Sequence, residues 1–342
     1  MAGNVPVHPE IPTGRTGVLL INLGTPAAPD VRSIRRFLAE FLSDRRVIEL
    51  NPLLWQPVLR LVILKLRPAR LVETYRGIWD AETGESPLRV HSREQAVRLG
   101  ERMDLAGRRI EVAWAVRYGS PSIEDGIAEL TAKGCRNILL FALYPQYSAT
   151  TTASAYDAAF RVLQRMRWQP AVRTAGPYHD DPAYIDALAA SLQEHVGALD
   201  WVPDRYLVSF HGLPRRYFDA GDPYHCHCAK TTRLLAERLG WPADRYSFAF
   251  QSRFGREEWL RPYMNEVLDA LPADGYRRVV VISPGFAADC VETLSEVAIE
   301  FRQAFLEAGG LEFSYVPCLN AEPRAIDMLE TLVQREVSGW PG

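Results

Sequence analysis

The chain has 342 residues, a length typical of about two domains, and 47% of its residues are hydrophobic, as in globular proteins. Its 39 basic and 42 acidic residues give a formal net charge of −3, which argues against a protein that holds nucleic acid by phosphate contacts. Five scattered cysteines do not form a disulfide framework, so a reducing, cytoplasmic location is expected.

The N-terminal segment, residues 1–16, is polar and lacks the apolar stretch of a signal peptide, so we expect a loose tail. The apolar segment 52–66, "PLLWQPVLRLVILKL", is interrupted by Pro57, Arg60 and Lys65, and its apolar runs are too short to span a membrane. A buried helix is the favoured interpretation of this segment. The alternative is an apolar surface helix at a pocket mouth or on a lipid surface.

Short apolar runs recur along the chain, and each is followed by a turn and a helical pattern. They lie at 17–24, 109–119, 136–146, 205–212, 245–252 and 277–285. Continuous apolar strands that alternate with helices predict parallel sheets with helices on both faces, and hence an α/β fold of two doubly wound halves. We expect a first domain at 17–170, a second at 171–318, and a C-terminal helix within 319–342 that packs back on the first domain.

The ends of the predicted strands indicate where a ligand would bind, because open α/β sheets bind ligands beyond the carboxyl ends of their strands. No G-x-G-x-x-G follows the first strand and no P-loop motif occurs, so dinucleotide and P-loop chemistry are disfavoured. The residues at the strand ends are Asn22, Leu23, Arg117, Tyr118, 144–147, His211, Gln251, Ser252 and 283–286.

His211 ends an apolar strand and precedes Gly212, a position where the backbone can approach a ligand. Position alone supports a functional and a structural role equally. The neighbouring motif His225-Cys226-His227-Cys228 offers metal ligands, yet C-x-C is not a zinc-finger spacing. A [2Fe–2S] cluster needs four cysteines, and the candidate ligands are Cys226, Cys228, Cys135 and Cys318. A thiol-rich loop without a metal is the alternative.

The segment "DCVETLSEVAIEF", residues 289–301, has the pattern of an amphipathic α-helix. Its apolar stripe, which continues past the segment, is Val291, Leu294, Ala298, Phe301 and Phe305. Three glutamates recur on the opposite face: Glu292, Glu296 and Glu300. A solvated acidic face is the simpler interpretation, and a carboxylate ladder that lines a cavity and attracts a cation is the other. Asp289 is interpreted as the N-cap.

Seven segments of the chain read, in order, "LLINLGTP", "ETYRGIW…GESPL", "VRYGSPSI", "YPQYS", "SFHGLPRRYFDAGDPY", "QSRFGREEWL" and "SPGFAADCVETLSE". In this order they resemble ferrochelatases, the terminal enzymes of haem synthesis, and the resemblance runs from about Gly17 to the C-terminal helix. The resemblance implies two similar Rossmann-like domains with an active-site cleft between them. It also implies a lyase that inserts Fe(II) into protoporphyrin IX and releases two protons.

The resemblance further implies the roles of individual residues. His211 would be the active-site histidine and Glu292 the glutamate opposite it, both meeting the metal, with Glu296 and Asp289 extending the acidic track. Cys290 stands where many members have histidine, and we expect it to be dispensable. The segment 52–66 would form an apolar lip. The implied porphyrin-binding positions are Leu23, Arg67, Tyr75, Ser86, Arg117, Tyr118, Tyr144, Tyr224, Trp259 and Phe286.

Several alternatives stay open at this point. Fe(II) is expected as substrate rather than as a resident cofactor, and the [2Fe–2S] cluster is neither required nor excluded. The same fold could act on coproporphyrin or insert cobalt into another tetrapyrrole.

A haem or porphyrin carrier is another class of function, although a carrier needs no pair such as His211 and Glu292. A two-lobed binding protein for an anionic small molecule is a third. Peripheral membrane contact through 52–66 and a monomer or homodimer are further expectations.

Overall fold

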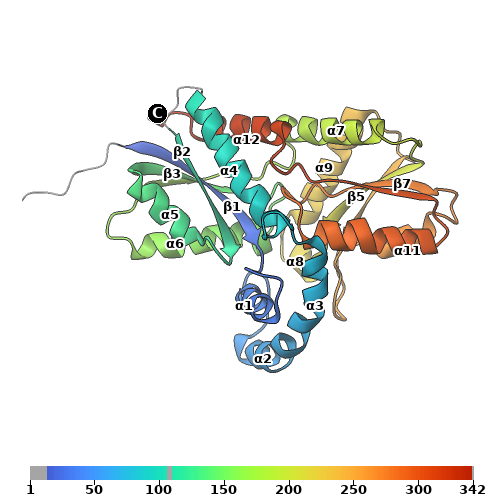
Figure 1. Ribbon diagram of the computed structural model, residues 1–342, viewed down its shortest axis with the longest axis horizontal. Coiled ribbons are helices and arrows are strands. Elements are labelled where there is room, and N and C mark those ends of the chain that lie inside the picture. The colour runs from blue at the N-terminus through green and yellow to red at the C-terminus, as the bar shows by residue number, and fades with distance from the viewer. Residues whose placement is uncertain (1–13, 106–109, 341–342) are drawn as a thin grey trace, which may run out of the picture.

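The computed structural model describes residues 14–105 and 110–340, which form two parallel four-stranded sheets lying side by side (Figure 1). The first sheet has the order β2-β1-β3-β4, with β1 Arg15–Gly24, β2 Ile110–Tyr118, β3 Cys135–Ala142 and β4 Ala171–Thr174. The second has the order β6-β5-β7-β8, with β5 Arg205–His211, β6 Tyr246–Gln251, β7 Arg278–Ile282 and β8 Glu312–Val316. The predicted α/β fold class is confirmed.

The central strand β1 shows why the apolar runs form two-sided sheets. Val18 and Leu20 pack into one hydrophobic cluster, whereas Leu19 and Ile21 pack into another. All four side chains are fully buried, as expected for alternating side chains of a strand that is covered on both faces.

Helices cover both faces of each sheet. On the first sheet α4 contacts β1 and β2 from one side, and α5 and α6 pack with the other cluster. Beside α4 Pro87–Leu105, the helices that surround the two sheets are α5 Ile123–Ala132, α6 Ser154–Arg165, α7 Pro182–Gly197, α8 Arg215–Asp219, α9 Tyr224–Leu239, α10 Met264–Ala270, α11 Arg302–Glu307 and α12 Pro323–Glu336. Two π-helices, η2 Ala149–Ala153 and η3 Glu292–Phe301, precede α6 and α11. Gly240 ends α9 in the left-handed conformation that is typical of a C-cap glycine.

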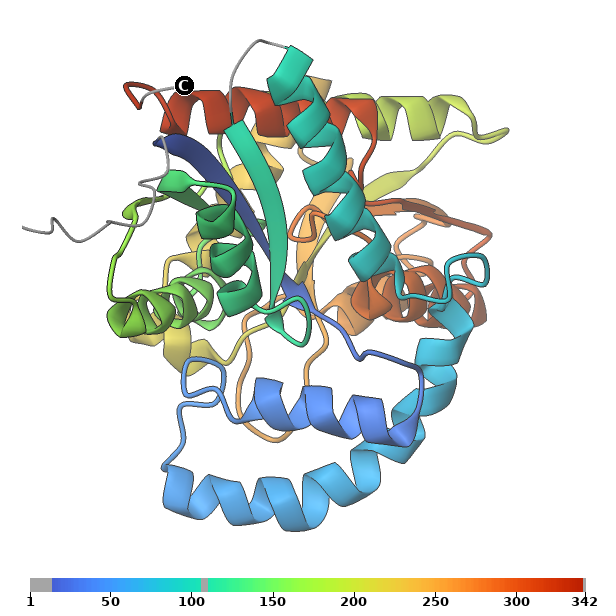
Figure 2. The same cartoon turned by 60° about the vertical axis from the view of Figure 1, so that its left-hand side comes forward.

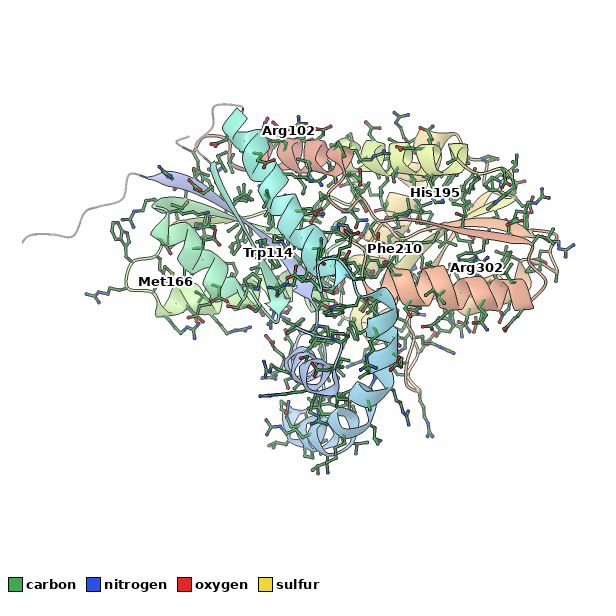
Figure 3. The ribbon with its side chains drawn as sticks, in the orientation of Figure 1. Arg102, Trp114, Met166, His195, Phe210 and Arg302 are labelled. Carbon is green, nitrogen blue, oxygen red and sulfur yellow. The ribbon has the colours of Figure 1, made fainter. Side chains whose placement is uncertain are left out.

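The boundaries between the two halves differ in detail from the sequence-based expectation. Because β4 pairs with β3, the first sheet extends to Thr174, beyond the expected domain end at residue 170. The helix α12 contacts both α4 and α7 along one edge of the molecule (Figure 1). Arg102 of α4, labelled beside α12 in Figure 3, forms ion pairs with Asp327 and Glu330. The expected tail at 1–16 lies mostly outside the described residues, and residues 15–16 belong to β1.

The segment 52–66 projects away from both sheets, beneath α1 Val31–Leu42 (Figure 2). It comprises α2 Pro52–Val58, η1 Leu59–Ile63 and the start of α3 Leu64–Ile78. Leu59 and Leu64 pack against α1 residues, but Leu53 is 83% exposed and Leu54 is 73% exposed. Only a narrow stripe of this segment faces α1, so the interpretation as a buried helix is wrong. The alternative of an apolar surface helix is correct.

Candidate functional site

His211 is the last residue of β5, near the middle of the molecule, where its neighbour Phe210 is labelled in Figure 3. Its Nδ1 atom lies 2.7 Å from the carbonyl oxygen of Gly212. A carbonyl oxygen only accepts hydrogen bonds, so Nδ1 carries a proton, and in the neutral form of the ring Nε2 would present its lone pair. His211 is half-buried, and its Nδ1 atom is the ring nitrogen held by the backbone.

Gly212 is required by close packing rather than by flexibility. A Cβ atom on this residue would lie 2.7 Å from the carbonyl oxygen of Gln251 and 3.0 Å from the ring of Trp259. The Gly212 N–H also donates to that Gln251 oxygen, at 2.8 Å. The absent side chain therefore lets β6 and Trp259 lie directly against the residue that follows His211.

The acidic segment is a π-helix, η3, with one more residue per turn than the α-helix that its pattern predicts. The expected apolar stripe is therefore confirmed only in part: Phe305 is fully buried, but within η3 the buried residues are Thr293, Ser295 and Val297. Glu292 and Glu296 are half-buried, whereas Glu300 is exposed and accepts a hydrogen bond from Ser295. Both interpretations of the glutamates thus hold in part, because the first two face inward and the third faces solvent.

Glu296 is held by the end of β6. The backbone N–H of Ser252 donates to its Oε1 at 2.7 Å, the Ser252 hydroxyl donates to Oε2, and Gln251 Nε2 donates to Oε2 at 3.2 Å. Burial raises the pKa of the Glu296 carboxyl group, while the Ser252 hydrogen bonds and the nearby charge of His211 lower it. His211 and Glu296 therefore share one electrostatic environment.

Glu292 lines a narrow pocket of about 290 Å³, which includes space open to solvent. Among the residues predicted to bind the porphyrin, Leu23, Tyr75 and Ser86 line the same pocket, together with Cys290. Burial raises the pKa of Tyr75 well above its usual value, and the charges of Glu292 and Cys290 act in the same direction, so the phenol stays neutral. The structure brings this half of the predicted site together.

His211 does not line that pocket, and its link to Glu292 passes through Gln251. The strand register pairs His211 with Gln251, whose Nε2 donates to the Glu292 carbonyl oxygen at 2.9 Å. The Oε1 atom of Gln251 accepts a 2.5 Å hydrogen bond from Ser209, which fixes the amide orientation. The side chain of Gln251 thus joins the strand that ends in His211 to the helix that begins with Glu292.

A row of aromatic and cationic side chains runs from α3 toward His211. The guanidinium carbon of Arg67 lies 5.6 Å from the ring centre of Phe254, whose ring makes an edge contact with Trp259 at 5.1 Å. Trp259 is buried beside Gly212, and its indole nitrogen has no hydrogen-bond partner among the described residues. The unpaired indole N–H is itself buried, so a ligand reaches it only if neighbouring side chains move.

Three other predicted positions form a separate buried cluster. Arg117 makes an ion pair with Asp44 and donates to Ser154, and the Tyr118 hydroxyl donates to Asp44 at 2.8 Å. Only 12% of the Arg117 side chain is exposed, so this cation is committed to Asp44 rather than free for a ligand. The Tyr144 hydroxyl is buried with no partner among the described residues, and burial raises its pKa well above the usual value.

The remaining predicted positions are placed as follows. Tyr224 is buried at the start of α9, and its hydroxyl oxygen lies 3.8 Å from the position of a Cβ on Gly285. Phe286 is half-buried in the segment that follows β7. Neither lines the pocket that contains Glu292.

The His-Cys-His-Cys motif is the first turn of helix α9, so the interpretation as a loop is wrong. Its side chains point in different directions: Cys226 is exposed, Cys228 is fully buried, and the His227 ring stacks on His179 with 3.6 Å between ring centres. Cys135 lies in β3, and Cys318 contacts Tyr315 beyond β8. The four predicted cluster ligands do not converge. Within 14–105 and 110–340, no three His, Cys, Asp or Glu side chains are arranged to hold a metal ion.

Asp289 is a buried hub rather than a helix cap. The N-cap of η3 is Val291, which makes no side-chain hydrogen bond to the helix, whereas the Asp289 carboxylate accepts hydrogen bonds from Thr293, Tyr315 and Asn320.

Asp44 and Asn320 are site-associated residues that the sequence did not reveal. An asparagine in "CLNAEP" was a weak signal for a left-handed turn position, and nothing in the sequence marked Asp44.

No helix among the residues that the structure describes is long and apolar enough to cross a membrane.

Comparison with known proteins identifies a common family. A sequence model of the ferrochelatase family matches residues 15–337. A ferrochelatase of Rhizobium meliloti (strain 1021) is 51% identical over 97% of this chain and 98% of its own length. A ferrochelatase of Agrobacterium fabrum (strain C58) is 50% identical over 97% of this chain and 96% of its own.

Solved structures support the fold. SirB from Bacillus subtilis with Fe3+ has a TM-score of 0.57 at 11% identity, covering 95% of this chain and 96% of that one. The sirohydrochlorin chelatase SirB of Bacillus subtilis subspecies spizizenii with cobalt has a TM-score of 0.54 at 11% identity, covering 95% and 97%. These likenesses concern the arrangement of two Rossmann-like halves. Together with the family match over nearly the whole described chain, they lead to one conclusion: the chain belongs to the ferrochelatase family.

Proposed function

We propose that the protein inserts Fe(II) into protoporphyrin IX to give protohaem, as a lyase in haem biosynthesis that releases two protons. The observation that carries this proposal is the grouping of His211, Glu296 and Glu292 around Gln251, beside a pocket whose walls include Tyr75 and Leu23. Family membership supports the reaction class, and the geometry supports the division of roles given below.

His211 serves as the proton acceptor. The inner N–H groups of the porphyrin lose two protons as iron enters, and a neutral imidazole with a free Nε2 is suited to take one near neutral pH. Its Nδ1–H bond to the Gly212 carbonyl oxygen holds the ring and the tautomer in place. A positioned general base of this kind contributes ~10²–10⁴-fold to the rate.

The carboxylates of Glu292 and Glu296 complement the histidine in handling Fe(II). Imidazole and carboxylate groups are suitable ligands for Fe(II), while a full set of thiolates would hold the metal too firmly to release it into the macrocycle. Glu296 is fixed by Ser252 and Gln251, whereas the Glu292 carboxylate lies at the pocket wall. We assign Glu292 to the macrocycle side and Glu296 to the approach of the metal, with Fe(II) as substrate.

The porphyrin is expected to enter between α3 and η3, which contact one another. A flat apolar macrocycle requires apolar walls and cations only at its carboxylate edge. Arg67 is an exposed cation of α3, and among the described residues no carboxylate pairs with it, so it is free to meet a propionate. Tyr75 and Ser86 are buried residues that line the same pocket.

The exposed apolar face of 52–66 supports peripheral contact with a lipid surface, where an apolar substrate is concentrated. Leu53, Leu54 and Leu61 are each more than 60% exposed, and Arg60 and Lys65 are exposed on the same segment. Apolar burial with a cationic edge favours anionic bilayers. In a co-sedimentation assay with phosphatidylglycerol vesicles, the native protein should be found in the pellet with the vesicles. The double variant Leu53→Ser with Leu54→Ser should stay in the supernatant. If the double variant also sediments with the vesicles, this segment does not make the contact.

The test of the main proposal is an anaerobic assay with Fe(II) and either protoporphyrin IX or coproporphyrin, monitored by the haem absorption band. His211→Ala should lose ~10²–10⁴-fold in turnover. Glu292→Gln should also be strongly impaired. His195→Gln is the matched control, because His195 bonds Ser314 on β8, away from this site. Unchanged turnover in His211→Ala would refute the role of the base. Tight porphyrin binding without turnover in the native protein would favour a carrier, and preference for coproporphyrin would favour the alternative substrate.

A further inference from the structure

Asp289 and Asn320 form a reciprocal pair of hydrogen bonds, although they are 31 residues apart. Asn320 Nδ2 donates to Asp289 Oδ2 at 2.7 Å, and the Asp289 backbone N–H donates to Asn320 Oδ1 at 2.8 Å. Both side chains are buried, with exposures of 4% and 9%. An aspartate and an asparagine placed in this way satisfy each other as donor and acceptor, so either one is costly to replace alone.

The Asp289 carboxylate has further donors. Its Oδ1 accepts from the Thr293 hydroxyl at 2.9 Å and from the Tyr315 hydroxyl at 2.8 Å. Thr293 lies one residue after Glu292 and also receives the Cys290 N–H at 3.0 Å. A buried carboxylate that accepts three strong side-chain hydrogen bonds is satisfied without a metal ion.

Asn320 also connects this pair to the first half of the molecule. The Gln95 side chain of α4 is buried, and its Nε2 donates to the Asn320 carbonyl oxygen at 2.7 Å and to that of Ala287 at 3.1 Å. The helix α4 begins beside Ser86, a wall of the pocket that contains Glu292. One amide of α4 therefore holds both chain segments that flank Asp289.

The backbone of Asn320 is in the left-handed region, with φ 50°. Among the described residues, Ser252 is the other non-glycine residue with positive φ, and it holds Glu296. Such conformations cost of order 1–3 kcal/mol and persist where the surrounding structure enforces them, often at functional sites. Both of these unusual backbone positions hydrogen-bond to the segment that supplies the acidic side chains.

We propose that Asn320 is a positioning residue: by clamping Asp289 against Gln95 of α4, it fixes where η3 begins and thereby holds Glu292 at the pocket wall. Asp289 acts within this clamp and not as an iron ligand. Only Cys290 and Val291 separate Asp289 from Glu292, and Thr293 ties this turn to the Asp289 carboxylate. A shift of about 1 Å at a catalytic group costs up to 10²-fold in rate, so the clamp has direct kinetic consequences.

The decisive experiment exchanges the two side chains. Asn320→Asp places two carboxylates face to face, and Asp289→Asn places two amides there, so each single variant breaks the pair. The double variant Asp289→Asn with Asn320→Asp restores one donor and one acceptor and keeps the net charge. We expect each single variant to lose on the order of 10–10²-fold in kcat. Protoporphyrin binding, measured by fluorescence quenching, should stay within a few-fold. The exchange should recover most of the turnover.

The exchange separates the clamp from direct metal binding. If the Asp289 carboxylate binds iron, the double variant stays as inactive as Asp289→Asn, and its KM for Fe(II) rises; that result would overturn the proposal. Full turnover in Asn320→Asp would also overturn it. Asp327→Asn is the matched control, since the Asp327 side chain is exposed on the outer face of α12 and pairs with Arg102. If a single variant does not fold, the double variant alone still decides, because only a restored pair gives an active enzyme.

Discussion

Ser252 donates two hydrogen bonds to the carboxylate of Glu296, one from its backbone N–H and one from its hydroxyl, while its own backbone is left-handed with φ 65°. The residue therefore combines a useful contact with an unfavourable conformation. For an L-residue other than glycine, this conformation costs roughly 1–2 kcal/mol. The arrangement places conformational strain one residue beyond the strand that pairs with His211.

Two substitutions separate the contact from the strain. Ser252→Ala loses the hydroxyl bond and keeps the strain, so we expect a loss of about 1–2 kcal/mol in the free energy of unfolding. Ser252→Gly loses the same bond but relieves the strain, and its stability should stay within about 1 kcal/mol of the native protein. Urea unfolding measures both values. Equal losses in the two variants would show that the conformation is not strained.

The buried ion pair of Asp44 with Arg117 should contribute far more than a surface pair. Asp44→Asn leaves the guanidinium of Arg117 buried without its carboxylate, and we expect a loss of about 3–5 kcal/mol. Asp157→Asn breaks a similar pair with Arg46, but 35% and 45% of those side chains are exposed, so a loss of about 0–1 kcal/mol is expected. Chemical unfolding of the two variants gives the comparison. Similar losses would mean that Arg117 finds another partner.

Gly212→Ala should impair catalysis through crowding. The added Cβ meets the Gln251 carbonyl oxygen and the Trp259 ring, so β6 must shift next to His211, at a cost of about 1–3 kcal/mol. We expect lower kcat together with lower stability. Gly197→Ala is the control, since nothing lies within 4 Å of its Cβ position at the end of α7, and it should be neutral or slightly stabilising. Native turnover in Gly212→Ala would contradict the packing argument.

His179 should make stability depend on pH. Burial and the charge of His227 lower its pKa from 6.5 to about 4. Between these two values the unfolded chain binds the proton and the folded protein does not, so the free energy of unfolding falls as the pH drops from 6.5 toward 4. His179→Phe keeps the stacked ring and removes the titration. Urea unfolding at several pH values should therefore show a shallower slope for this variant, and an unchanged slope would exclude His179 as a source.

The sequence predicted the strands well because burial on both faces produces uninterrupted apolar runs, such as "VLLIN" in β1, that few other structures explain. The rule that ligands bind beyond the carboxyl ends of parallel strands identifies His211, Gln251 and Ser252 without any motif.

The errors have identifiable physical causes. The segment 289–301 has an apolar repeat of 3.6 residues, but the hydrogen bonds of 292–301 close a wider turn. The repeat therefore identifies the buried Phe305 but not the buried Thr293, Ser295 and Val297. The segment 52–66 was expected in the core because hydrophobicity alone does not distinguish burial from a functional apolar surface. Asp44 and Asn320 act through partners that are 73 and 31 positions away, and such pairs have no local pattern.

The unusual winding of η3 has an evolutionary consequence. A π-helix is equivalent to an α-helix that has gained a residue in each turn, so losing one amino acid between Glu292 and Phe301 would let part of it rewind into the commoner form without disturbing the sheets. If the loss fell between Glu292 and Glu296, the helix residues beyond it would rotate about the helix axis, and Glu296 would leave Ser252 while both sheets survived. Chain length within this helix is therefore expected to be under tighter selection than the identity of many of its side chains.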